Sequence, residues 1–116
     1  MFGQSSYLIS LCKEQKLAER AAWDYIEALP EDEKFELVVI NPSFILGPNL
    51  GSPDFTSAEI ITKMMRKEYS AMPKVFQAIV DVREVAMAHL QALKVPEAGM
   101  NRFILSSENL WFKDIA

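Results

Sequence analysis

The sequence predicts an α/β fold in which helices flank a partial parallel sheet. Residues 35–40 form an apolar run that stops at Asn41 and Pro42, which is typical of a strand buried on both faces. Segments with helical periodicity alternate with further short extended runs. Two or three such strands are too few to complete a parallel sheet, so we expect this stretch to have evolved inside a longer fold.

Residues 10–29 form the first predicted helix. Apolar side chains recur there at intervals of three, four and seven, which places them on one helix face, and Pro30 ends the pattern. We expect Trp23 to anchor this helix against the sheet. The apolar positions are Leu11, Ala18, Ala22, Tyr25 and Leu29.

A charged turn at residues 31–34 leads into the predicted strand, and an irregular loop closed by Gly47 and Pro48 follows it. Open parallel sheets bind their ligands beyond the carboxyl ends of the strands. The loop that begins at Asn41 is therefore the candidate ligand site.

The second half of the chain predicts two more helices and two more strands. Thr56 and Glu59 form a capping box ahead of a helix that carries Ile60, Ile61, Met64 and Met65. Residues 75–80 are the next strand. Met64 and its neighbours are interpreted as core filling.

Asp81 caps the third predicted helix, with Glu84 in its first turn. Arg83 and Glu84 are interpreted as a solvated pair. Residues 96–99 are a turn, residues 102–105 are the last strand, and Ser106 or Ser107 caps a terminal helix. The apolar positions of the third helix are Val85, Ala86, Leu90 and Leu93.

Composition excludes several classes of protein. The net charge of −4 and the lack of a basic stripe interleaved with aromatic residues disfavour nucleic acid as a partner. No apolar run approaches the roughly 20 residues that span a bilayer, and no signal peptide is expected. The lone Cys12 fits a reducing compartment, so we expect a cytoplasmic location. A metal site is not expected, because His89 is the single histidine.

Four motifs resemble one family in order and separation: KLAERAAW, ELVVINPSFILGPNL, VDVRE and NRFIL. They resemble the C-terminal portion of an extended short-chain dehydrogenase/reductase, in the NAD-dependent epimerase/dehydratase superfamily. The dihydroflavonol, cinnamoyl-CoA and ketone reductases are the most similar group. Residues 13–116 would be a partial NAD(P)-binding and substrate region on a Rossmann-like sheet that lacks its N-terminal half. Residues 1–12 depart from the family pattern.

The family's catalytic pair is missing from this sequence. In the family, a tyrosine and a lysine four residues apart share one helix face, and the tyrosine exchanges a proton with the substrate oxygen. The resemblance places Leu11 and Gln15 at these positions, so no catalytic residue carries over. The glycine-rich turn GxxGxxG that binds the pyrophosphate is also absent from the 116 residues.

The resemblance assigns binding roles to the loop after the first strand. Pro42, Ser43 and Phe44 would lie against the nicotinamide end of NAD(P). The residues expected to shape the pocket of a carbonyl substrate are Leu46, Gly47, Pro48, Asn49 and Leu50. Without the family, the NP and GP pairs are also explained as ordinary turns.

Three functions remain open. In the first, the chain is a fragment of an NAD(P)(H)-dependent oxidoreductase that reduces a carbonyl to an alcohol, and the fragment is inactive alone. Alternatively, it is a non-catalytic protein that associates through an exposed sheet edge or its first helix, or a small-molecule-binding module. Uncovered apolar surface would favour association in each case.

Overall fold

The structure, a computed structural model, describes residues 2–51, 56–68 and 74–115. Side chains are described for residues 12–51, 59–68 and 74–114. Among the described helices, none is long and apolar enough to cross a membrane. The elements are α1 (Phe2–Ala28), β1 (Val38–Pro42), β2 (Phe44–Leu46), α2 (Thr56–Met65), β3 (Phe76–Asp81), α3 (Val82–Lys94), the 3-10 turn η1 (Pro96–Ala98), β4 (Asn101–Leu105), β5 (Glu108–Trp111) and α4 (Phe112–Ile115).

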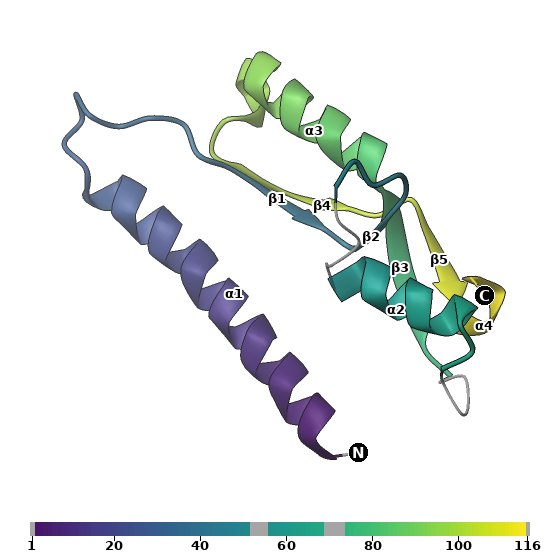
Figure 1. The fold of residues 1–116 in the computed structure, drawn as a ribbon. Helices are drawn as coiled ribbons and strands as arrows, with labels where there is room; N and C mark the ends of the chain where they lie inside the picture. Colours follow the sequence, from purple (N-terminus) through teal and green to yellow (C-terminus); the bar gives the residue numbers. More distant parts are fainter. Residues whose placement is uncertain (1, 52–55, 69–73, 116) are drawn as a thin grey trace.

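Two small sheets lie end to end (Figure 1). In the first, β1 and β4 are parallel, with Val38 opposite Asn101 and Pro42 opposite Leu105. In the second, β3 pairs in parallel with β2 and antiparallel with β5. The chain continues from β1 into β2 and from β4 into β5. These two strands lie on opposite sides of β3. The predicted fold class, a partial parallel sheet with flanking helices, is confirmed.

Helices α1 and α3 cover opposite faces of the sheet formed by β1 and β4 (Figure 1). Asn41 and Arg102 face α1, whereas Ile40 and Phe103 face α3, because successive side chains of a strand alternate between faces. A parallel pair with a helix on each side is the arrangement that the alternating pattern predicted.

Helix α1 begins at Phe2, earlier than the predicted start near residue 10, and runs through position 12 without a break. It ends before Pro30, as predicted. The side chains facing the sheet differ from the prediction: Ile26 is buried at 3% exposure, whereas Tyr25 and Ala18 are exposed. Trp23 is half-buried and lines the space between α1 and the sheet, in line with its predicted anchoring role.

Strand β1 is shifted from the prediction. It covers Val38–Pro42 instead of residues 35–40, and its five residues are only half-buried. The predicted loop also contains strand β2, because the backbone of Phe44–Leu46 pairs with β3. Pro42 is compatible with pairing at this point, because it is the last residue of β1.

The end of the chain was predicted wrongly. Ser106 and Ser107 do not cap a helix but precede β5, and the short helix α4 begins only at Phe112. Pairing with β3, in which Phe76 lies opposite Trp111, determines this strand. The two aromatic rings lie 5.1 Å apart between centroids. Such a long-range pairing has no signal in the local sequence.

Helix α3 begins and ends as predicted, but three of the four residues of its predicted apolar face are exposed. The Asp81 carboxylate accepts a hydrogen bond from the Arg83 backbone N–H at 2.8 Å, which confirms the N-cap. Val85 is buried, whereas Leu93 is 86% exposed. The residues that face the sheet are Val85, Ala88 and Ala92.

The buried core is small. The buried apolar side chains among the described residues are Ile26, Met64, Val80, Val85 and Ala98. The radius of gyration is 17.4 Å, where a compact domain of this length has about 13 Å. The described chain is therefore an extended arrangement of elements around little shared interior.

Candidate functional site

The chain passes from one sheet to the other at Ser43. Its backbone N–H donates to the Leu105 carbonyl at 2.9 Å, at the carboxyl end of the parallel pair β1 and β4. A second passage lies beside it, where the Ser107 N–H donates to the Ile79 carbonyl at 2.9 Å. The two strands diverge here at their carboxyl ends, with β3 between their continuations, and the carboxyl ends of parallel strands are where α/β sheets bind ligands.

The three predicted cofactor residues lie together at this passage. Pro42 ends β1, Ser43 follows it, and Phe44 begins β2, where its ring packs 6.1 Å from that of Phe112. The Ser43 hydroxyl oxygen is buried and has no hydrogen-bond partner within the described part of the chain. Buried polar atoms are normally paired, so an unpaired hydroxyl here fits a missing polar group of a ligand.

Of the five predicted substrate residues, the first is half-buried and the other four are exposed. Leu46 pairs with Asp81, and Gly47 has a φ of +130°. A Cβ at Gly47 would lie 2.9 Å from Cγ1 of Val82, so the loop closely approaches the start of α3. The other exposed residues are Pro48, Asn49 and Leu50, of which Leu50 is fully exposed.

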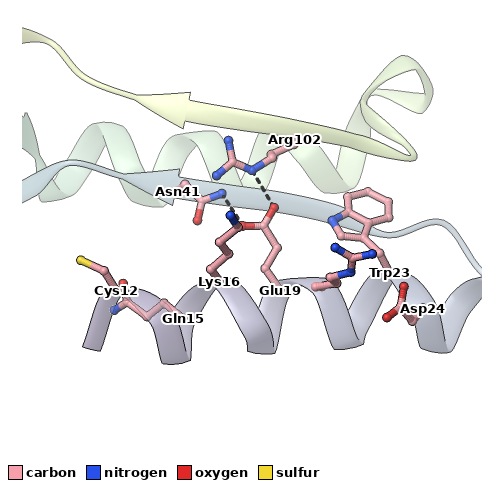
Figure 2. Close-up of a pocket in the computed structure, with 9 residues that line it drawn as sticks. Cys12, Gln15, Lys16, Glu19, Trp23, Asp24, Asn41 and Arg102 are labelled. Atoms are coloured by element: carbon pink, nitrogen blue, oxygen red, sulfur yellow. Dashed lines mark hydrogen bonds and ion pairs between the residues drawn. The ribbon is translucent and has the colours of Figure 1, made fainter. Parts of the chain in front are cut away.

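An open cleft of about 630 Å³ lies between α1 and the face of β1 and β4 (Figure 2). Gln15, which the sequence resemblance assigns to the family's lysine position, lines this cleft together with Asn41, the residue before the predicted cofactor segment. Leu11 lies one helical turn before Gln15 on α1, and its side chain is outside the described part of the structure. The fold therefore brings Gln15 of α1 and Asn41 of β1 to one cleft.

Glu19 is the polar centre of this cleft. Its carboxylate accepts a 2.6 Å hydrogen bond from Nε of Arg102 on β4 and a 3.3 Å one from Nδ2 of Asn41 on β1 (Figure 2). Hydrogen bonding from Arg102 lowers the pKa of Glu19 below its ordinary value, and hydrogen bonds from Asn41 and Trp23 act in the same direction.

Sequence reasoning assigned no role to Glu19. The one signal that could have indicated it is its position in the KLAERAAW motif, four residues after Gln15, which places both side chains on one helix face. Its partner Arg102 is 83 residues away in the sequence, so the ion pair itself has no local signature.

The VDVRE segment is structural, as predicted, but the predicted pair of Arg83 with Glu84 is wrong, because Arg83 pairs with Asp81. Asp81 accepts hydrogen bonds from the backbone N–H and the guanidinium of Arg83, and these bonds lower its pKa to about 2. The same contact raises the pKa of Arg83. Glu84 accepts a hydrogen bond from the Ser107 hydroxyl and so links α3 to the second passage between the sheets.

The remaining candidate groups show no arrangement for catalysis or metal binding. Nδ1 of His89 lies 2.8 Å from the Val85 carbonyl of its own helix. Cys12 is exposed on α1. In the described ranges, no cluster of three or more His, Cys, Asp or Glu side chains could hold a metal ion.

Known proteins with similar sequences are reductases, although no family model matches the chain. NADPH-dependent methylglyoxal reductase of Saccharomyces cerevisiae is 33% identical over 97% of this chain and 34% of its own length. Cinnamoyl-CoA reductase 2 of Arabidopsis thaliana is 35% identical over 85% of this chain and 28% of its own length. The chain thus spans about a third of the relatives it matches.

The structural comparison gives the same group. The crystal structure of yeast methylglyoxal/isovaleraldehyde reductase complexed with NADPH matches with a TM-score of 0.79 and 31% identity, over 89% of this chain and 32% of that one. Sequence and fold agree along nearly all of the described elements. The chain is therefore related to the reductases of the extended short-chain dehydrogenase/reductase family, and it corresponds to a C-terminal portion of them.

Proposed function

We propose that this chain forms the nicotinamide-side and substrate-side wall of an NADPH-dependent carbonyl reductase site, and that it does not reduce carbonyls by itself. The observation that carries the proposal is the passage at Ser43, where an unpaired buried hydroxyl lies at the carboxyl end of a parallel strand pair. Gln15 and Asn41 line one cleft beside it, which supports a site shared by α1 and this passage.

The residues of the passage suit the nicotinamide end of a dinucleotide. Ser43 offers a buried hydroxyl that can donate to or accept from an amide. Pro42 and Phe44 offer apolar surface on either side of it. When bound, the cofactor would supply the hydride. Leu46 and Gly47, held against the start of α3, would shape the substrate side together with residues 48–50.

The two positions that the resemblance assigns to the family's catalytic pair supply no proton donor in this chain. A leucine at position 11 has no ionisable group, and the glutamine at position 15 carries no charge that could lower a phenol pKa. The 116 residues also contain no GxxGxxG turn for the pyrophosphate. The residues at positions 11 and 15 and the missing glycine-rich turn both support a chain that forms one side of the site without supplying the catalytic groups.

A reductase assay tests this proposal. Purified chain is mixed with NADPH and either methylglyoxal or isovaleraldehyde, the aldehydes named for the yeast relatives, and NADPH absorbance is followed. The yeast enzyme is the positive control. We expect no consumption of NADPH beyond the rate without protein. Consumption that rises in proportion to chain concentration would contradict the proposal.

We also propose that the chain associates with a partner, through the free edge of β1 or through α1. Within the described residues, β1 pairs only with β4, so its other edge carries unpaired backbone groups. Leu17 and Tyr25 of α1 are exposed large side chains. Together with the small core, this observation favours a non-catalytic interaction role as the second candidate.

Light scattering coupled to size exclusion tests association. We expect complexes or aggregates that grow with chain concentration. A monomer that unfolds cooperatively at all concentrations would contradict this second proposal. A small-molecule-binding role would instead appear as saturable NADPH binding by such a monomer. The exposed thiol of Cys12 supports a reducing, cytoplasmic location for either role.

A further inference from the structure

The contact between α1 and the sheet is polar at its centre. Glu19 lies on α1, and its carboxylate accepts hydrogen bonds from both strands of the first sheet, at Asn41 and Arg102. The Glu19 side chain is only 19% exposed, although the cleft around it is open. An ion pair between exposed side chains contributes little, but this carboxylate is largely shielded and has donors on both strands.

We propose that Glu19 is a positioning residue that holds the helix with positions 11 and 15 at a fixed distance from the Pro42–Phe44 segment. Asn41 is the link, because it donates to Glu19 and directly precedes Pro42. Arg102 is the second link, on the neighbouring strand. This role in a reductase site rests on the proposed function. The position of α1 itself can be tested without any nucleotide.

Apolar packing alone does not determine where α1 lies along this face. Ile26, near the C-terminal end of the helix, is its one buried described side chain, and Trp23 one turn earlier is half-buried, whereas Leu17 is exposed. A helix held by apolar contacts only near its C-terminal end can pivot about that end, since nonpolar contacts are not directional. Hydrogen bonds to Glu19, two turns earlier, fix the direction of the helix, because their strength depends on distance and angle.

Distance measurements by pulsed electron spin resonance test this role. Spin labels are placed at two exposed helix positions, Lys13→Cys on α1 and Ala86→Cys on α3, in a Cys12→Ser background. We expect one narrow distance distribution for this chain, and a shifted or broadened one after Glu19→Gln. The matched control is Glu27→Gln, an exposed glutamate of the same helix, which should leave the distribution unchanged.

A charge reversal separates positioning from a general loss of stability. Glu19→Arg combined with Arg102→Glu should restore a narrow distribution that each single change broadens. Arg102→Gln serves as the test if Glu19→Gln does not fold, and it should also broaden the distribution. Unchanged distributions in the folded variants would overturn the inference. Failure of NADPH to bind would count against the proposed function and leave these distances unaffected.

Discussion

At the scale of single residues, backbone geometry constrains position 47 to glycine. Its φ of +130° is rare for residues with a side chain, and a Cβ there would lie 2.9 Å from Cγ1 of Val82. The GP pair was predicted to close the loop, and this conformation gives the physical reason for the glycine. The same close approach joins the predicted substrate residues to the start of α3.

We predict that Gly47→Ala lowers the free energy of unfolding by about 1–3 kcal/mol, the usual cost of a residue held in a disfavoured backbone region. Gly51→Ala is the matched control, because a Cβ at Gly51 would meet only Asn49 Oδ1, at 3.9 Å. Urea unfolding followed by circular dichroism measures both variants. Equal stability of the two variants would show that the approach to Val82 imposes no constraint.

Asp81 makes stability depend on acid pH. Its pKa is about 2 in the folded chain against an ordinary 3.8, because Arg83 donates hydrogen bonds to the charged form. A lowered pKa means that the unfolded chain binds the proton more readily, so this contribution is present above 3.8 and is lost as pH falls towards 2.

We predict that Asp81→Asn keeps the N-cap but removes this part of the pH dependence, because asparagine caps helices without titrating. Stability measured at several pH values between 4 and 2 should fall less steeply for Asp81→Asn than for the unmodified chain. Parallel curves for the two proteins would contradict this assignment. Asp114→Asn, an exposed carboxylate outside any described cap, is the control.

At the scale of elements, the sequence predicted those with strong local signals. The strand before Asp81 and the helix after it were predicted, because Asp81 is both the end of a β-rich run and an N-cap. Strands β2 and β5 were missed. Both depend on pairing with β3, which is distant in the sequence, and Phe44–Leu46 is too short to show a period.

The residues of the candidate site were also predictable only where the local sequence carries a signal. The Pro42–Phe44 segment was indicated by a polar break after an apolar run. The Glu19 cluster was not, because it joins three elements through side chains whose proximity only the fold creates. The apolar face of α3 was assigned too broadly, because periodicity cannot show which apolar positions meet another element.

We predict that Val85→Ala lowers the free energy of unfolding by about 1.5 kcal/mol, because it removes two methyl groups from a buried position. Leu93→Ala should change it by less than about 0.5 kcal/mol, since Leu93 is exposed. Both changes lie on α3, and because valine has a lower helix propensity than leucine, the gain in helix propensity offsets more of the loss at Val85 than at Leu93. A larger loss from Leu93→Ala in urea unfolding would indicate that a partner copy covers that side chain.

At the scale of the whole molecule, exposed surface is the dominant feature. The accessible area is 9349 Å², where a compact monomer of this mass exposes about 6400 Å². Apolar side chains such as Ile104 and Trp111 contribute to this additional accessible area, as do polar side chains. Relatives that match the chain are about three times its length, so the matched region lies beside further structure in those proteins.

A chimera tests the central claim that this chain is a wall of a reductase site without its catalytic pair. Residues 11–116 replace the matching segment of the yeast methylglyoxal reductase, once unchanged and once with Leu11→Tyr and Gln15→Lys. We predict that both versions bind NADPH and that only the second consumes it with methylglyoxal. Turnover by the unchanged version, or no binding by either, would contradict the account.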